Sequence, residues 1–144
     1  MKKNVLLLCA VWLMLSLVFA IGCAPKSVNT VKVTGTITID GKPLEQGGIK
    51  FSSVNNDTTA SGGTITNGTY AAEVPPGKKK VLIIGVKVVG REKLYDTPDS
   101  PTREKLETVT PTAYNKKELT PLEADITGET KDLNFELSSK FKHK

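Results

Sequence analysis

The chain has 144 residues and a formal charge of +5, which gives room for one domain and a targeting segment. Loss of Lys2 and Lys3 with a signal peptide would take the 20 basic residues to 18 against 15 acidic ones, a balance too mild to indicate a nucleic-acid partner. Aromatic residues make up only 6% of the chain, and its 12 glycines and 8 prolines favour short strands and turns over packed helices.

The first 22 residues have the layout of a bacterial secretory signal. A basic start over residues 1–4 precedes an apolar run from Val5 to Ile21 that no charge interrupts. The five residues Phe19 to Cys23 resemble a lipobox, in which small or apolar residues precede a cysteine that receives a diacylglyceryl group and becomes the mature N-terminus. This resemblance implies cleavage between Gly22 and Cys23, and anchoring of the protein in membrane lipid by acyl chains on Cys23.

Two alternatives stay open for this segment: an ordinary cleaved signal with an unrelated cysteine, or an uncleaved anchor helix. Residue 24 is Ala24, where an Asp retains enterobacterial lipoproteins in the inner membrane, so the resemblance implies the outer membrane. Cys9 lies within the signal, which leaves no cysteine pair for an intrachain disulfide. We therefore expect a lipoprotein of the bacterial cell envelope, periplasmic or surface-facing, held by a lipidated tether over residues 23–30.

From residue 31 the chain alternates between apolar and polar side chains. This period of two predicts a strand with one face in a core and the other in water. Asp40-Gly41 then predicts a turn, because glycine adopts positive φ at no steric cost. A second strand follows Gly47-Gly48. The apolar residues of the two strands are Val31, Val33, Ile37, Ile39, Ile49 and Phe51.

The remaining segments repeat this pattern. Residues 52–63 are predicted as a loop, and Asn67-Gly68 is a strong hairpin signal before a strand that carries Tyr70 inward. Residues 81–84 are apolar at every position, which predicts a central strand covered on both faces. The lysines at positions 78–80 are interpreted as a solvated edge. Two last strands are predicted over residues 122–126 and 133–137, and residues 139–144 form a basic tail.

About seven short strands with no helical stretch predict an all-β domain, an antiparallel β-sandwich over residues 31–138. Residues 34–51 and 65–83 resemble the carboxypeptidase regulatory-like domain, which has a transthyretin-like sandwich fold. Its marks appear here as the opening over residues 35–48, the hairpin Asn67-Gly68-Thr69-Tyr70, and the strand entry over residues 76–81. The segments 111–115 and 133–137 are similar to those of small lipoproteins of this class in planctomycete-type bacteria. These motifs imply a fold, not an activity.

The stretch 90–118 breaks the alternation. It is highly charged, contains Pro98, Pro101 and Pro111, and is longer than an ordinary connection. We predict a long loop insertion packed over one edge of the sandwich, with one helical turn over residues 104–109. This loop is expected to hold the contact surface of the protein. Its candidate contact residues are Tyr95, Arg103 and Tyr114.

Few residues point to catalysis. His143, the single histidine, lies in the tail, so neither a Cys/His metal cluster nor a Ser-His-Asp triad can be assembled. Transthyretin-like hydrolases depend on paired histidines and a C-terminal Tyr-Arg-Gly-Ser, which this chain lacks. We expect no enzyme activity, metal or cofactor.

The first functional hypothesis is a non-catalytic, lipid-anchored envelope module with a structural or interaction role, whose partner is an envelope protein or polysaccharide. A second is a carbohydrate- or peptide-binding module in which Tyr95 and Tyr114 stack on a ligand. A hydrolase is a third, and it would require a concave cluster of titratable side chains.

Overall fold

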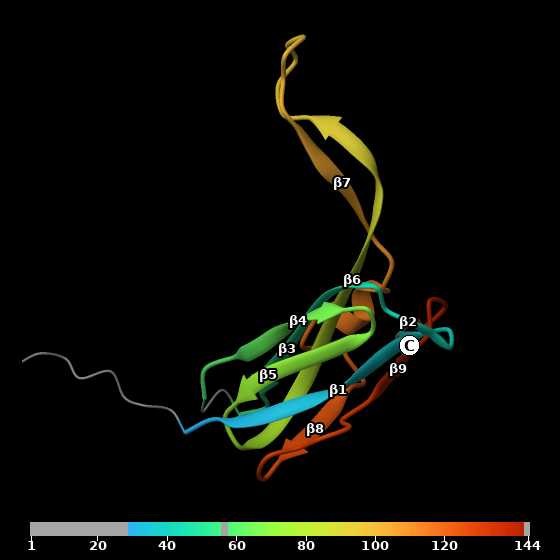
Figure 1. Cartoon of the computed structure of the whole chain (residues 1–144). Helices are drawn as coiled ribbons and strands as arrows, with labels where there is room; N and C mark the ends of the chain where they lie inside the picture. Colours follow the sequence, from blue (N-terminus) through green and yellow to red (C-terminus); the bar gives the residue numbers. More distant parts are fainter. Residues whose placement is uncertain (1–28, 56–57, 143–144) are drawn as a thin grey trace, which may run out of the picture.

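The computed structural model describes residues 29–55 and 58–142, so the predicted signal peptide, Cys23 and His143 lie outside the described residues. The described chain is all-β apart from one short 3₁₀ helix, η2 (Thr112–Asn115) (Figure 1). The strands are β1 (Val31–Ile39), β2 (Lys42–Pro43), β3 (Gln46–Ser53), β4 (Ser61–Thr66), β5 (Thr69–Val74), β6 (Gly77–Lys93), β7 (Thr102–Thr108), β8 (Glu123–Ile126) and β9 (Phe135–Leu137).

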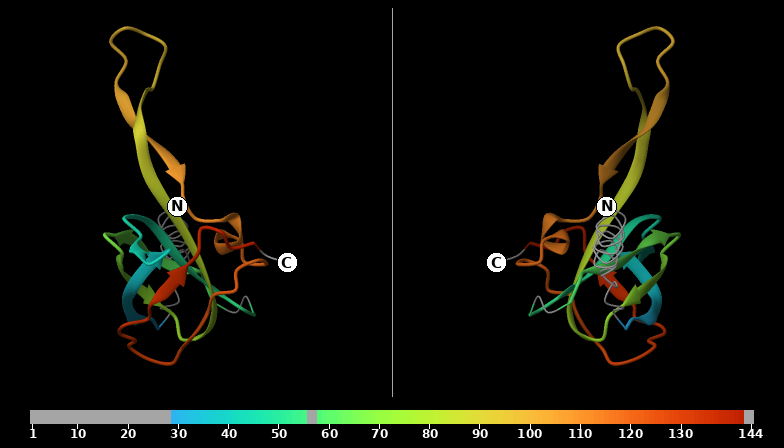
Figure 2. Two further views of the ribbon diagram at one scale, coloured as in Figure 1. Left: turned by 90° about the vertical axis from the view of Figure 1, so that its right-hand side faces the viewer. Right: turned by 90° about the vertical axis from the view of Figure 1, so that its left-hand side faces the viewer.

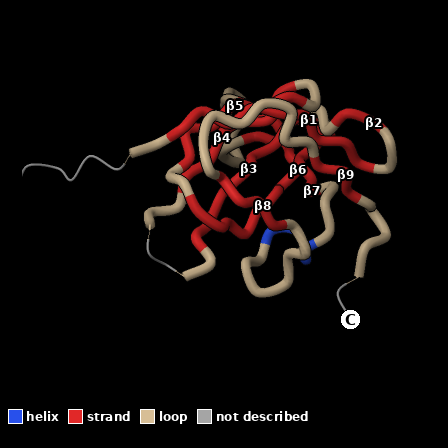
Figure 3. Tube along the Cα trace, turned by 90° about the horizontal axis from the view of Figure 1, so that it is seen from below, coloured by secondary structure: helices blue, strands red, loops and turns tan. Residues whose placement is uncertain are grey.

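The strands form a mainly antiparallel sheet in the order β2-β1-β5-β4-β3-β6-β7. Two later strands extend this order: β8 pairs antiparallel to β6, and β9 pairs parallel to β1. The sheet curls, and the two strands that complete it follow one another in the chain: β8 lies beside β6, and β9 lies beside β1 (Figures 1 and 3). The predicted all-β, largely antiparallel architecture is confirmed.

The core lies inside the curl and is built by the predicted alternation. Val33 and Ile37 on β1 are fully buried, while their polar neighbours face outward. Three aromatic rings from different strands meet in this core: Tyr70 lies 6.2 Å from Phe51 and 6.5 Å from Phe135, measured between ring centroids. Tilted rings at this spacing are a favourable arrangement. The inward position predicted for Tyr70 is therefore confirmed.

The predicted turns form where glycine follows a small polar residue. Asp40 and Gly41 have φ of 49° and 78°, and Asn67 and Gly68 have φ of 50° and 76°. Two successive positive φ angles are the conformation that joins antiparallel strands most tightly. Both predicted turns are confirmed.

Two strand predictions were wrong. The loop expected over residues 52–63 is shorter, because β3 continues to Ser53 and β4 begins at Ser61. The strand over residues 81–84 is covered on one face only: Ile83 is fully buried, whereas Ile84 is 42% exposed. The reason is that a single curled sheet has one inner face, so alternate residues point to water even in β6, which has neighbouring strands on both sides.

The segment before β9 runs along β1 and closes the core. The Tyr70 hydroxyl donates a hydrogen bond of 2.7 Å to the carbonyl oxygen of Leu133, and the Leu133 amide donates one of 3.0 Å to the carbonyl oxygen of Thr34. The main chain of Leu133 lies directly over Gly35, where a Cβ atom would collide with it. Gly35 thus permits the close approach of these two segments.

We predict that Gly35→Ala destabilises the fold by about 1–3 kcal/mol, because the new methyl group must push the Leu133 main chain away from β1. Urea unfolding followed by circular dichroism measures this change. Gly128→Ala is the matched control, since a Cβ atom there meets no other atom within 4 Å. Equal unfolding midpoints for the two variants would contradict the packing described here.

Candidate functional site

The second half of β6 and the whole of β7 form a two-stranded arm that leaves the body of the protein (Figures 1 and 2). The pairing of β6 with β3 ends at Val86, opposite Gln46. Beyond Val86, β6 pairs with β7 as far as Lys93, opposite Thr102. We call residues 87–107 the arm, with its root at Val86 and Thr108 and its tip over residues 94–101.

The arm corrects the prediction of a loop packed over one edge across residues 90–118. Residues 102–108 form a strand, with no helical turn, and only the chain after the arm lies against the body. The alternation was missing because neither face of the arm covers a core, so its strands need no apolar side. Instead, opposite charges face each other across the two strands: Lys87 and Glu107, Arg91 and Glu104, Glu92 and Arg103.

One of these cross-strand pairs is a close ion pair. The Arg103 guanidinium contacts the Glu92 carboxylate at 2.6 Å through Nη2 and donates a 2.7 Å hydrogen bond to it through Nε. Two nitrogen contacts to one carboxylate hold Arg103 against β6. The candidate contact residue Arg103 therefore has a role in holding the arm together.

The arm carries most of the exposed large apolar side chains in the described part of the chain. Five of its side chains are strongly exposed: Val88, Val89, Leu94, Tyr95 and Leu106. A two-stranded hairpin without a third strand or a core is marginally stable in water. Apolar side chains left exposed on such an element indicate a contact surface.

The two candidate tyrosines lie in different environments. Tyr95 is at the tip, 66% exposed, and its amide donates a 2.8 Å hydrogen bond to Ser100 Oγ. Tyr114 is buried in the body, where its hydroxyl accepts a hydrogen bond from the Ser138 amide and its ring lies 5.0 Å from that of Phe141. The interpretation of Tyr114 as a surface contact residue was wrong. A stacking platform built from both tyrosines is likewise excluded.

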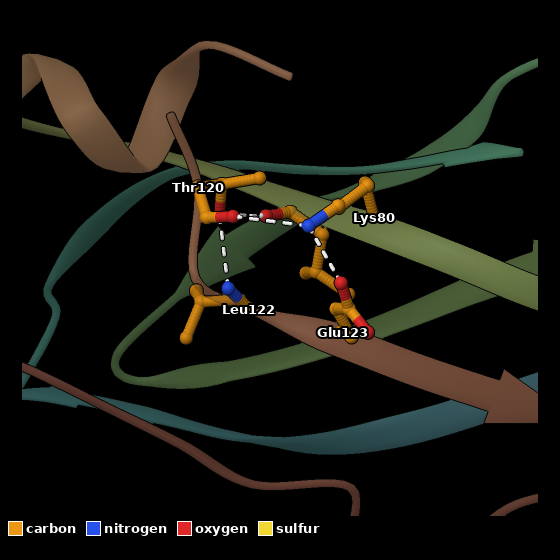
Figure 4. A network of polar contacts seen from close by, with 5 residues as sticks. Lys80, Thr120, Leu122 and Glu123 are labelled. Atoms are coloured by element: carbon orange, nitrogen blue, oxygen red, sulfur yellow. Dashed lines mark hydrogen bonds and ion pairs between the residues drawn. The ribbon is translucent and has the colours of Figure 1, made fainter. Parts of the chain in front are cut away.

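The interpretation of the lysines at positions 78–80 as a solvated edge holds for Lys78, which is exposed, and was wrong for Lys79 and Lys80. Lys79 is 1% exposed, and its ammonium donates a 2.8 Å hydrogen bond to Thr58 Oγ1. Lys80 makes a 2.6 Å ion pair with Glu123 on β8 (Figure 4). The hydrogen bond and charge of Lys80 hold the pKa of Glu123 below its usual value.

A threonine completes this polar network. The Thr120 hydroxyl donates a 2.7 Å hydrogen bond to the Val81 carbonyl and accepts one of 3.2 Å from the Leu122 amide (Figure 4). Because Thr120 is buried, each of these bonds replaces one that water would otherwise supply. The network fixes the start of β8 against β6, so its role is structural.

The residues 29–55 and 58–142 contain no group of three His, Cys, Asp or Glu side chains placed to hold a metal ion. The same residues include no helix with the length and hydropathy of a membrane span.

The register of the sheet places the arm at the end of the body opposite to residue 31. Val31 pairs with Val74, three residues before β6 begins at Gly77, whereas the arm continues from the other end of β6. With 17 residues in one strand, β6 extends over about 50 Å at about 3.3 Å per residue. The arm therefore points away from the start of the domain.

No protein-family model and no curated protein matches this chain. Among solved structures, a 9R-lipoxygenase from Cyanothece PCC8801 is similar to it, with a TM-score of 0.39 and 13% sequence identity over 81% of this chain. The chain spans 18% of the length of that lipoxygenase. A likeness this weak carries no argument about fold or activity.

We predict that Tyr114→Ala destabilises the protein by about 3 kcal/mol, because it removes a buried ring from the body. Tyr95→Ala is the matched control and should change stability by less than about 0.5 kcal/mol, because its ring is exposed at the tip. Thermal unfolding of both variants checks this difference. A larger loss from Tyr95→Ala would mean that the tip packs against the body.

Proposed function

We propose that this protein is a non-catalytic module of the bacterial cell envelope, anchored in a membrane by lipid on Cys23, which uses the arm as its contact element. The arm is the observation that carries the proposal. It is a long hairpin whose strands set opposite charges across from each other, with a close ion pair between Glu92 and Arg103, and it exposes apolar side chains near its root and at its tip. Such an element adds nothing to the core, so its use lies in reaching another molecule.

The sequence before the domain supports an anchor close to it. The lipobox-like residues end at Cys23, and β1 begins at Val31. Eight residues span at most about 28 Å when fully extended. A lipid on Cys23 would therefore keep the body near the membrane surface.

The polarity of the sheet then sets the direction of the arm. Residue 31 lies at one end of the body and the arm leaves from the other. The arm therefore lies at the end of the body away from the anchor. We propose that the contact is made there, at a distance from Cys23.

We further propose that the body is a β-sandwich of the transthyretin-like type. The curl brings the inner faces of β1 and β5 against those of β3 and β6, as the meeting of Phe51 with Tyr70 illustrates. The two turns of the resemblance, Asp40-Gly41 and Asn67-Gly68, lie at the same end of this body, which supports the assignment.

We predict that labelled palmitate enters the protein in its native membrane and that Cys23→Ser abolishes the label, because only the Cys23 thiol is left to carry acyl chains after cleavage. Autoradiography of the immunoprecipitated chain measures incorporation. Cys9→Ser is the control and should leave the label unchanged, since Cys9 would leave with the signal. Label retained by Cys23→Ser would rule out the anchor.

A second prediction tests the arm. We expect that replacing residues 89–105 by a short Gly-Ser turn leaves the unfolding midpoint of the body almost unchanged, because the arm does not pack in the core and the loop-closure term changes slowly with length. The same change should abolish the adducts that a lysine cross-linker forms in native membranes. Val54→Ser is the control, because it removes an exposed apolar side chain outside the arm. Adducts that survive the replacement would place the contact surface on the body.

A further inference from the structure

The outer edge of β7 is open in the described structure, where this strand pairs only with β6. The Val109 amide donates a 2.9 Å hydrogen bond to the Gly85 carbonyl, which fixes which main-chain groups of β7 face β6. Since these groups alternate along a strand, the odd-numbered residues of β7 direct their amides and carbonyls toward β6. The outward groups belong to Thr102, Glu104, Leu106 and Thr108.

An open strand edge of this kind pairs with another strand, and β7 fits a second copy of itself. Two copies related by a two-fold axis must pair antiparallel, with outward residues opposite outward residues. Only a few registers satisfy both conditions. They differ in which residue of β7 lies at the axis, and the charges of the strand distinguish between them.

One register brings opposite charges together at every charged pair within β7. With Leu106 at the axis, Lys105 faces the partner's Glu107, and Glu107 faces the partner's Lys105. An axis at Lys105, Glu104 or Glu107 would instead oppose two like charges at the axis, which is destabilising. The strand sequence Thr102-Arg-Glu-Lys-Leu-Glu-Thr108 is thus self-complementary about Leu106.

The same register also covers exposed apolar surface. Val88 lies opposite Leu106 within one arm, and both side chains are exposed, at 42% and 51%. Pairing at the axis would set Leu106 beside the partner's Leu106. A continuous apolar row of four side chains would then cross the joined arms, with Lys105–Glu107 pairs on the opposite face.

We propose that two copies of this protein associate through their arms, with β7 paired antiparallel to the partner's β7 about Leu106. The proposal rests on the arm being the contact element and names its partner as a second copy of the chain. Each marginal two-stranded arm becomes half of a four-stranded sheet, joined by about six main-chain hydrogen bonds. The arms run in opposite directions, and Thr102 lies level with the partner's Thr110, so each tip extends past the other copy's root.

A charge-exchange experiment tests this register. Two differently tagged full-length chains are co-expressed, solubilised from membranes in detergent, and captured through one tag. We expect the native pair to be captured together, and Lys105→Glu in both copies to reduce capture at least about tenfold, because each introduced carboxylate would face the partner's Glu107.

The double variant Lys87→Glu/Glu107→Lys tests the same pair from the other side. It preserves the charge pair within the arm, but it places the new lysine at position 107 opposite the partner's Lys105, so it should reduce capture similarly when both copies carry it. Mixing one copy of each variant should restore capture, because every facing pair is again opposite in charge.

Controls separate pairing from folding and from lipid anchoring. Lys50→Glu makes the same charge change on β3, outside the arm, and should leave capture intact. The Lys105→Glu chain should keep the native unfolding midpoint, and Leu106→Asp should also lose capture. The proposal is overturned if all combinations are captured equally, if the native pair is not captured, or if mixing one copy of each variant fails to restore capture. The capture experiment is repeated with chains that also carry Cys23→Ser. Capture in these chains would show that pairing does not depend on the lipid anchor.

Discussion

The pairing of β3 with β6 is the constraint on which the rest of this protein depends. Eight successive residue pairs, from Ser53–Lys79 to Gln46–Val86, fix the first part of β6 in the core. That register decides which residues of β6 point inward, so that Val81 and Ile83 are buried while Ile84 is exposed. It also decides where the pairing with β3 ends and β6 continues with β7 as its neighbour. The arm is therefore an extension of a strand that is paired in the body, and the position of β6 in the body determines the direction of the arm.

The C-terminal third of the chain supplies the segments that pair with β1 and β6 and complete the sheet. The Thr120 network and the Lys80–Glu123 ion pair hold β8 on β6, and the following segment crosses to β1 through the Leu133 main chain. Tyr70 is the point where these parts meet, since its ring packs in the core and its hydroxyl bonds to Leu133. These segments cover strand edges that would otherwise be open on the body. In the arm, the outer edge of β7 is left uncovered.

Sequence patterns predicted the parts of the fold in which one strand face is buried. Val33, Ile37 and Tyr70 follow a period of two because a core selects apolar residues at alternate positions. The arm escaped prediction because strands in water on both faces carry no such period, although its facing charges were visible as a balanced run. Tyr95 and Tyr114 look alike in the sequence, and only the three-dimensional course of the chain buries one of them. Burial of Lys79 likewise depends on the neighbouring loop that supplies Thr58.

The long-range contacts of β1 have a consequence for how the chain folds. Thr36 bonds to Asn134 and Asp40 bonds to Ser139, contacts that join residues 98 and 99 positions apart. Contacts so distant in sequence form slowly, because nearly the whole chain must be confined before they yield any stabilisation. The first strand to leave a ribosome or a translocation pore is thus the last to gain its outer neighbour. Until residues 130–139 arrive, β1 presents an apolar strand with one bare side, so a chain truncated before that segment would aggregate during biogenesis even though most of its core residues are present.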